Sequence, residues 1–202
     1  MSPRSPGAQR HQVRIIGGQW RRSLLPVADK PGLRPTPDRV RETLFNWLGQ
    51  DLSGWRVLDA FAGSGALGFE AASRGAAEVL LMEQDGDLVR SLNASRERLK
   101  ASSVRVQRGD GLAHLRASPA RYDLVLLDPP FGAGLGPTAL VAAARAVVAG
   151  GWVYLEAGEP LPDTAAPGLL RYREGRAGAV HFTLFRADDE AASAPSYTGR
   201  PD

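Results

Sequence analysis

From Trp55 onward, apolar β-prone runs alternate regularly with helix-like stretches, and glycine-marked connections of a few residues separate them. Such an order is typical of an α/β domain with a doubly wound, mostly parallel sheet. We expect strands near residues 55–59, 78–83, 103–108, 122–128 and 151–156, and helices near 65–74, 87–100, 111–117 and 137–149. Residues 169–173 and 180–186 break the pattern and predict a closing antiparallel β-hairpin, which brings the sheet to seven strands.

The fourth expected strand ends in an unusual group of side chains. The apolar run that starts at Tyr122 leads into Asp128, Pro129, Pro130 and Phe131. In an open α/β sheet, ligands bind at the carboxyl ends of the parallel strands. Two successive prolines stiffen the backbone and remove N–H donors, so the carbonyl groups around Asp128 and Pro129 face outward as acceptors beside a flat ring. This stretch predicts a binding site for a planar amine.

The first expected strand leads into a glycine-rich loop. Gly63, Gly65 and Gly68 satisfy the G-x-G-x-x-G pattern of dinucleotide-binding proteins, and Glu83 follows about 20 residues later. However, Asp59 stands between the strand and the loop, where a carboxylate would oppose a pyrophosphate. It would suit the ammonium group of a methionine moiety, such as S-adenosylmethionine carries.

Two further acids follow the next two strands. Glu83 ends the second strand, where it can accept hydrogen bonds from both ribose hydroxyls of the cofactor. Asp110 ends the third strand, where it can accept from the adenine amino group; the alternative is an acid that only caps a turn. The sequence therefore predicts S-adenosylmethionine as the cofactor.

Methyl transfer from a sulfonium needs little acid–base help, because the donor is already activated. The acceptor is the difficulty, since an exocyclic amine of a base delocalises its lone pair into the ring. The Asp128 carboxylate and the Pro129 carbonyl can bind the two N–H groups and stabilise the positive charge that develops on nitrogen. Phe131 would stack on the base, which must be unpaired or flipped out to enter such a pocket.

Composition limits the classes of protein to which this chain can belong. The chain has 202 residues, of which 43% are hydrophobic and 23% charged, so one main domain is expected. No apolar run approaches the roughly 20 residues of a membrane span, and the N-terminus lacks the apolar centre of a signal peptide, which indicates a cytoplasmic protein. The absence of cysteine excludes disulfides and thiolate chemistry, and His11, His114 and His181 have no metal-ligand spacing, so no metal site is expected.

Positive charge is concentrated at the front of the chain. Residues 1–41 carry nine basic and two acidic side chains, a net charge of +7, whereas the remainder has a net charge of −4. Residues 13–27 read as two short strands around a glycine-bearing connection, hence a basic hairpin. Such a segment is typical of an arm that contacts nucleic acid; the alternative is a solvated basic tail. The arginines expected to meet the nucleic acid are Arg14, Arg21, Arg22, Arg34, Arg39 and Arg41, and the family resemblance given below makes that nucleic acid RNA.

A helix should follow the hairpin. Thr36 is a good N-cap, Pro37 fits the first helical position and Asp38 favours the positive helix end. An apolar face then places Arg39 and Arg41 on other faces. We divide the chain into a disordered N-terminus (1–12), a basic hairpin and helix that contact RNA (13–50), a catalytic domain (51–186) and a flexible tail (187–202).

Several motifs resemble a known family, from about Val13 to Phe185. The stretches Asp128–Phe131 and Asp59–Gly65 resemble the acceptor and cofactor motifs of amino-methyltransferases that act on nucleic-acid bases. The stretches Arg14–Arg21, Gly32–Thr36 and Asp38–Leu48 are similar to the bacterial 16S ribosomal RNA guanine-N2 methyltransferases of the RsmD type. The resemblance implies a class I methyltransferase sheet, S-adenosylmethionine as methyl donor, and N2 of one guanine in 16S rRNA as acceptor, met within a partly assembled 30S subunit. We expect a monomer.

The resemblance also implies roles by position. Asp128, Pro129 and Pro130 hold the amine and Phe131 stacks on the base. The cofactor is held by Asp59, Phe61, Gly63, Gly65, Glu83, Asp110 and Gly111. Three alternatives remain: an amino-methyltransferase for adenine N6 or cytosine N4 in DNA or another RNA, an NAD-dependent oxidoreductase, and a binding module without catalysis. A sequence-reading DNA enzyme usually has a separate recognition domain, for which 202 residues leave little room.

Overall fold

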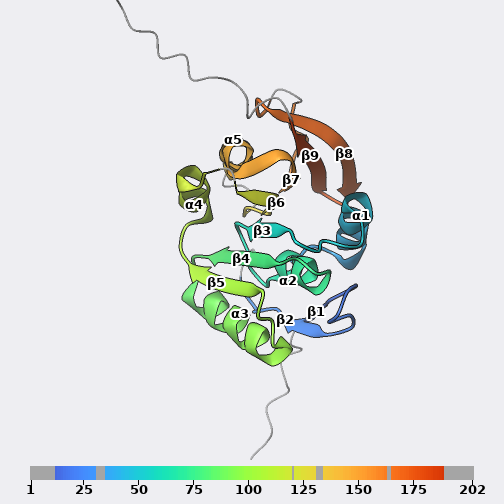
Figure 1. Cartoon of the computed structure of the whole chain (residues 1–202), viewed down its shortest axis with the longest axis vertical. Coiled ribbons are helices and arrows are strands. Elements are labelled where there is room, and N and C mark those ends of the chain that lie inside the picture. The colour runs from blue at the N-terminus through green and yellow to red at the C-terminus, as the bar shows by residue number, and fades with distance from the viewer. Residues whose placement is uncertain (1–11, 31–34, 120, 131–133, 163–164, 189–202) are drawn as a thin grey trace, which may run out of the picture.

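The computed structural model describes residues 12–30, 35–119, 121–130, 134–162 and 165–188. Its centre is a seven-stranded sheet, as expected, and the strands lie in the order β5-β4-β3-β6-β7-β9-β8 (Figure 1). The strands are β3 (Arg56–Asp59), β4 (Glu78–Glu83), β5 (Val104–Arg108), β6 (Tyr122–Leu127), β7 (Val147–Ala157), β8 (Leu169–Ala177) and β9 (Val180–Ala187). The first five are parallel, and β9 runs antiparallel to both of its neighbours. Because the strand order reverses between β3 and β6, the ligand crevice of such a sheet lies at their carboxyl ends.

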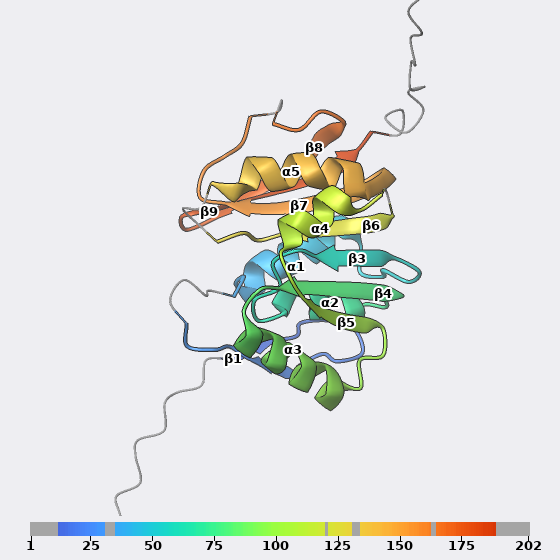
Figure 2. The same ribbon diagram turned by 90° about the vertical axis from the view of Figure 1, so that its left-hand side faces the viewer.

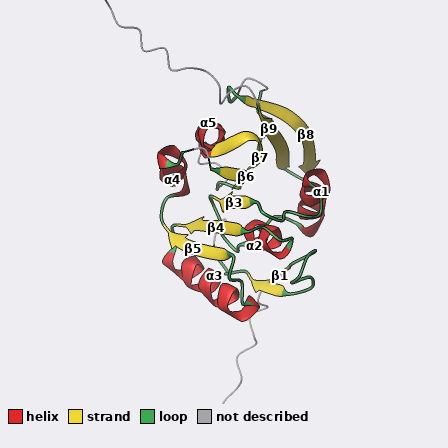
Figure 3. Ribbon diagram, in the orientation of Figure 1, coloured by secondary structure: helices red, strands yellow, loops and turns green. Residues whose placement is uncertain are grey.

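Helices cover both faces of the sheet (Figures 2 and 3). The helices are α1 (Asp38–Leu48), α2 (Ala66–Ser73), α3 (Gly86–Leu99), α4 (Gly111–Ala117) and α5 (Leu135–Ala146). The buried apolar side chains of α1 and α2, together with Leu92 of α3, belong to one apolar cluster, and those of α4 and α5 belong to another. The sheet therefore separates two cores. None of the helices in the described part of the chain is long and apolar enough to cross a membrane.

The N-terminal hairpin is built as expected and packs on the helical layer around α2. Strands β1 (Gln12–Arg14) and β2 (Leu24–Pro26) pair antiparallel, with Val13 opposite Leu25. Both of these side chains are buried in the same cluster as α1 and α2. The connection between the strands lies on α2, where the N–H groups of Ile16 and Gly17 each donate to the Glu70 carboxylate at 2.8 Å. The hairpin thus shares its core with the sheet domain.

Several boundaries differ from the expected ones. The helix expected at 137–149 begins at Leu135 and ends at Ala146, because Val147 already pairs with Tyr122 at the start of β7. The prediction that Thr36 caps α1 was wrong: the helix begins at Asp38 after Pro37, and no side chain in the described part of the chain caps it. The terminal segments 1–12 and 187–202 lie outside the described residues, apart from Gln12 in β1, Ala187 in β9 and Asp188.

Candidate active site

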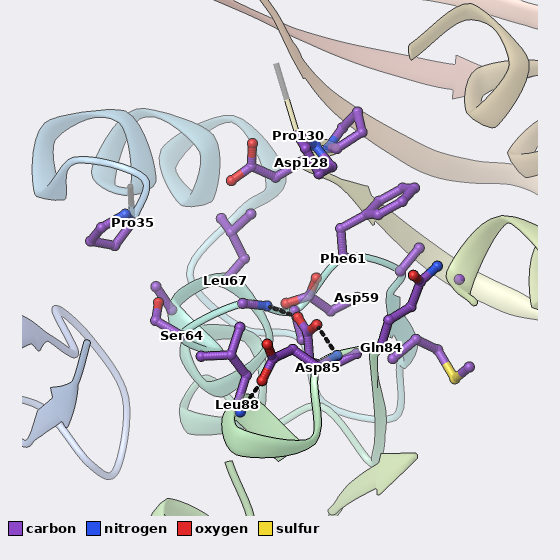
Figure 4. Close-up of a pocket in the computed structure, with 18 of the residues that line it drawn as sticks. Pro35, Asp59, Phe61, Ser64, Leu67, Gln84, Asp85, Leu88, Asp128 and Pro130 are labelled. Atoms are coloured by element: carbon purple, nitrogen blue, oxygen red, sulfur yellow. Dashed lines mark hydrogen bonds between the residues drawn. The ribbon is translucent and has the colours of Figure 1, made fainter. Parts of the chain in front are cut away.

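A cavity of about 390 Å³ lies at the carboxyl ends of β3, β4 and β6, where the strand order reverses (Figure 4). Figure 4 shows Asp128 and Pro130 on one side of it and Asp85 and Leu88 on the other. The cavity is lined by 59–64, Ala66, Leu67, 82–85, Leu88, Gly109, Gly111, 128–130 and Leu135, together with Lys30, Pro35 and Thr36 from the front of the chain. Its volume lies in the range of a small-molecule site, which is about 300–1,000 Å³.

The glycine loop forms one wall of the cavity. Gly63 lines it and has a φ of 51°, in the left-handed region that favours glycine. Gly65, at φ 79°, caps the start of α2 instead, and it is not among the lining residues. A Cβ atom there would lie 2.7 Å from the side chains of both Phe69 and Leu92. Within the described residues, Gly65 thus serves the turn into α2, not the cavity surface.

Asp59 ends β3 and is only 1% exposed. Its Oδ2 accepts from the Gly68 N–H at 3.0 Å, while Oδ1 has no hydrogen-bond partner within the described residues. Burial raises the pKa of Asp59 to about 7; the nearby N–H groups of Gly68 and Phe61 partly offset this, and the charges of Glu83 and Glu156 add to it. A cation in the cavity would supply the missing partner and favour the ionised carboxylate.

Glu83 ends β4 and links the walls of the cavity. Its Oε2 accepts from the Gly63 N–H and its Oε1 from the Asp85 N–H, both at 2.9 Å. Each carboxylate oxygen has a further lone pair, so Glu83 retains the capacity to accept from two hydroxyl groups.

Lys30 was not singled out from the sequence. It lines the cavity and its Nζ forms an ion pair with Asp85 and, at 3.1 Å, with Asp87 at the start of α3. A local pattern cannot reveal this contact, because 55 residues separate Lys30 from Asp85.

The prediction that Asp110 accepts from the adenine amino group stays a prediction, because one of its two oxygens has another role. Its Oδ1 accepts from the N–H groups of Leu112 and Ala113 at 2.8 and 3.2 Å, so this side chain caps α4. Asp110 is exposed, and its neighbours Gly109 and Gly111 line the cavity in its place. Gly111 is constrained by packing, since a Cβ atom there would lie 1.8 Å from the Ala60 carbonyl oxygen. Phe61 lines the cavity as expected.

Asp128 follows β6 on the opposite side of the cavity. Burial raises the pKa of its carboxyl group well above the ordinary value, and the charges of Glu156 and Asp59 raise it further. Pro129 is buried and Pro130 is exposed, and both line the cavity. Phe131 lies outside the described residues.

Behind Asp128 lies a group of residues that the sequence did not reveal. The Thr36 hydroxyl donates to Glu156 Oε1 at 2.7 Å and lies 3.5 Å from Asp128 Oδ2. The Tyr154 hydroxyl donates to the same Glu156 oxygen at 3.0 Å. One signal was present: Glu156 follows the apolar run Val153–Leu155 near the end of β7, just as Asp59, Glu83 and Asp128 close their own strands.

Only some of the arginines that were expected to contact RNA are exposed. Arg14, Arg21, Arg22 and Arg39 are exposed, and Arg34 lies outside the described residues. Arg41, in contrast, is fully buried, which corrects its assignment to RNA. Its guanidinium donates to Glu70 at 3.1 Å, to Asp38 at 2.7 Å, and to the carbonyls of Arg14 and Thr36 at 2.8 and 3.2 Å.

The arrangement favours a small cationic ligand that also carries hydroxyl groups. Asp59, Asp128 and Glu156 all have raised pKa values because they are buried close together, and a positive charge in the cavity would relieve this cost. Glu83 has acceptor capacity for hydroxyl groups. Asp128 and the carbonyl of the buried Pro129 offer acceptors for an amine on the opposite wall.

Several known proteins are similar to this chain in sequence and in fold. A "Ribosomal RNA small subunit methyltransferase D" from Escherichia coli is 42% identical over 190 residues, covering 90% of this chain and 93% of that protein. The protein of the same name from Haemophilus influenzae is 37% identical over 181 residues, covering 87% and 94%. A solved structure of the Escherichia coli protein yhhF superposes with a TM-score of 0.78 at 37% identity, covering 89% of this chain and 99% of that one.

The family match extends across the fold described above. The family described as "Conserved hypothetical protein 95" matches residues 13–186, from the basic hairpin to the last strand of the sheet. Because this match spans most of the chain, and because near-full-length relatives are 37 to 42% identical, the chain belongs to this family, the RsmD family of ribosomal RNA small subunit methyltransferases.

Proposed function

We propose that this protein transfers a methyl group from S-adenosylmethionine to the exocyclic N2 amine of a guanine in 16S rRNA. One observation carries the proposal: Asp128–Pro129 and the acids Asp59 and Glu83 line the same cavity at the switch point of a class I methyltransferase sheet. The names of the near-full-length relatives give the substrate class, small-subunit rRNA. The choice of guanine N2 rests on the resemblance of the N-terminal motifs to the guanine-N2 enzymes.

Asp59 and Glu83 would hold the cofactor from two sides. Oδ1 of Asp59, which has no partner among the residues that the structure describes, would accept from the ammonium of the methionine moiety. Glu83 would accept from the ribose hydroxyls. Phe61, Gly109 and Gly111 would border the adenine end of the cofactor. When bound, S-adenosylmethionine supplies an electrophilic methyl group whose leaving group is a neutral thioether.

Asp128 and Pro129 would prepare the acceptor. The carboxylate and the Pro129 carbonyl accept the two N–H bonds of the amine, orient its lone pair toward the cavity, and stabilise the positive charge that develops on nitrogen. Positioning accounts for most of the rate gain in such a reaction, because oriented reactants reach effective molarities of roughly 10⁵ M or more. The ionised form of Asp128 is needed, and a cationic donor nearby favours it.

The exposed arginines of the hairpin and α1 would meet the RNA backbone. Arg14, Arg21, Arg22 and Arg39 all lie on the N-terminal segment, which also supplies Thr36 to the cavity. Phosphate contacts fix the register of a nucleic acid without reading its sequence. The substrate would be an assembling 30S particle, so we place the activity in the bacterial cytoplasm and propose that the monomer is the active form.

The test is methylation of 30S particles from cells that lack this protein, with radiolabelled S-adenosylmethionine and the purified chain. We expect label in 16S rRNA, and mass spectrometry of the nucleosides should identify N2-methylguanosine. Label in N6-methyladenosine or N4-methylcytidine would show that the acceptor is adenine or cytosine and not guanine. Binding of NADH but not of S-adenosylhomocysteine would overturn the proposal in favour of an oxidoreductase.

A further inference from the structure

Thr36 stands between two carboxyl groups that come from different strands. Its Oγ lies 2.7 Å from Glu156 Oε1, near the end of β7, and 3.5 Å from Asp128 Oδ2, after β6. Thr36 is 3% exposed and Glu156 2% exposed, yet Thr36 borders the cavity and Glu156 does not. A hydroxyl therefore connects the proposed amine-binding acid with a second acid buried behind it.

The single hydrogen of the Thr36 hydroxyl sets the direction of the hydrogen bonds among Thr36, Glu156 and Asp128. A threonine hydroxyl has one hydrogen to donate and can also accept. The shorter contact assigns that hydrogen to Glu156, so a lone pair of Thr36 is available to Asp128. The Tyr154 hydroxyl also donates to Glu156, at 3.0 Å, and burial beside Glu156 raises the pKa of Tyr154 well above 10, so it remains a donor. An Asp128 that has gained a proton can thus donate to Thr36, while Thr36 donates to Glu156.

We propose that Thr36 and Glu156 form a proton path behind Asp128, which takes up the proton that the amine loses on methylation. This inference rests on the proposed function and deepens it. The new N–C bond forms as the S–C bond breaks, sulfur keeps the bonding electron pair, and the nitrogen is left with one positive charge and one proton in excess. That proton passes to Asp128, then to the Thr36 oxygen as the Thr36 hydrogen moves to Glu156. Asp128 is thereby ionised again.

The charges around the path are suited to this transfer. Burial raises the pKa of both Asp128 and Glu156, which favours a proton on each, and the charge of Glu156 also opposes ionisation of Asp128. Asp59 adds a further negative charge to the environment of Asp128. The hydrogen bonds from Thr36 and Tyr154, and the charge of the Arg41 guanidinium, act in the opposite direction on the pKa of Glu156 and favour the ionised form that can accept a proton.

Arg41 fixes the geometry from behind. Its Nε donates to the Thr36 carbonyl at 3.2 Å, and the guanidinium is held by Glu70 on α2 and by the Arg14 carbonyl on β1. The N-terminal segment therefore completes the catalytic site as well as carrying arginines for RNA. Thr36 and Glu156 are positioning residues that act through Asp128.

The proposal is tested with Thr36→Val, Thr36→Ser and Glu156→Gln, assayed on 30S particles as above. Loss of the hydroxyl or of the second carboxylate should lower kcat about tenfold or more, since positioned proton transfer contributes roughly 10²-fold or more. Thr36→Ser should recover most of the rate lost in Thr36→Val. Thr43→Val is the matched control, because the Thr43 hydroxyl donates to the Arg39 carbonyl on the exposed side of α1. Calorimetry should give the same S-adenosylhomocysteine Kd for all variants within about twofold.

The pH dependence separates a proton path from a structural role. In Glu156→Gln the charge that opposes ionisation of Asp128 is gone, so the acid limb of the kcat profile should shift to lower pH by roughly one unit. A uniform loss of rate at every pH, or a Thr36→Val enzyme with wild-type kcat, would overturn the proton path. If the wild-type protein itself fails to methylate 30S particles while it binds S-adenosylhomocysteine, the proposed function fails instead.

Discussion

The Arg41 guanidinium lies 3.1 Å from the Glu70 carboxylate, and both side chains are fully buried. Glu70 also accepts from the Arg74 guanidinium at 2.8 Å and from the two hairpin N–H groups of Ile16 and Gly17. One carboxylate on α2 thereby joins the N-terminal hairpin, α1 and its own helix. Since Arg41 in turn holds Thr36, this ion cluster connects the stability of the fold to the acceptor side of the cavity.

Glu70→Gln should destabilise the protein by about 3–5 kcal/mol, because it removes the carboxylate that pairs with the buried Arg74 and leaves the buried Arg41 with only Asp38 as an ion-pair partner. Urea unfolding followed by circular dichroism measures this. Glu78→Gln at the exposed start of β4 removes the same charge without a buried partner among the described residues and should change stability by less than about 0.5 kcal/mol. Equal unfolding midpoints for the two variants would show that the buried cluster contributes little.

Asp128→Ala should abolish methylation while cofactor binding stays nearly intact. The carboxylate accepts from the amine, so its loss should lower kcat by about 10²-fold or more, as removal of one transition-state acceptor or donor does. Methyl incorporation into 30S particles measures the rate, and calorimetry with S-adenosylhomocysteine measures binding. An Asp128→Ala enzyme that still methylates at the wild-type rate would remove Asp128 from the mechanism.

Cofactor affinity should depend on the ionisation of Asp59. Burial raises the pKa of this carboxyl to about 7 in the free protein, whereas a bound ammonium group favours the ionised form. Binding below pH 7 therefore releases a proton, and affinity rises with pH until Asp59 is ionised without ligand. We expect the Kd of S-adenosylhomocysteine to fall by up to about tenfold per pH unit from roughly pH 5.5 to 7, and then to level off.

Asp59→Asn is the control for this pH dependence, because it retains an acceptor for the Gly68 N–H but cannot ionise. Its Kd should be weaker at pH 8 and nearly flat between pH 5.5 and 7. The same raised pKa has a consequence for folding: above the ordinary pKa of 3.8 the unfolded chain has lost this proton while the native protein keeps it. The Asp59 contribution to stability therefore falls as pH rises from about 4 to 7. A pH-dependent Kd that persists in Asp59→Asn would assign the titration to another group.

Gly111→Ala should distort the wall of the cavity. The added Cβ would lie 1.8 Å from the Ala60 carbonyl oxygen, which is backbone and has to shift. We expect a loss of about 1–3 kcal/mol in unfolding free energy and a weaker S-adenosylhomocysteine Kd, since Ala60 borders the cavity next to Phe61. Gly158→Ala is the matched control, because nothing lies within 4 Å of its added Cβ among the described residues.

Charge reversal of Arg21 and Arg22 should weaken RNA binding. Both side chains are exposed on the connection between β1 and β2. If each contacts one phosphate, the slope of log K against log salt should fall by roughly 1.5–2 in the double glutamate variant. The same reversal at Arg116 and Arg145, which border a second cavity beside α4 and α5, should leave the slope nearly unchanged. Equal slopes for the two double variants would argue against a hairpin contact.

The sequence by itself determined the order of the strands and helices along the chain and four of the five acids at the strand ends. These are local signals: the period of the apolar residues, the glycine turn after Asp59, and the two prolines that follow β6 and Asp128. They determine the strand ends at which ligand-binding acids lie, because parallel strands share one carboxyl edge. Even Glu156 follows the same rule, although it was not recognised.

Tertiary packing alone decided which polar side chains meet. Thr36 has the local signature of a helix cap, but its hydroxyl donates to the carboxylate of Glu156, 120 positions away. Arg41 lies off the expected apolar stripe of α1, yet the hairpin and α2 cover it and supply partners for its charge. Asp110 stands at a strand end like the other acids, but the two N–H groups that follow it occupy one of its oxygens. Helical period and turn propensity determine local direction only, whereas burial and hydrogen-bond partners depend on segments that folding brings together from distant parts of the chain.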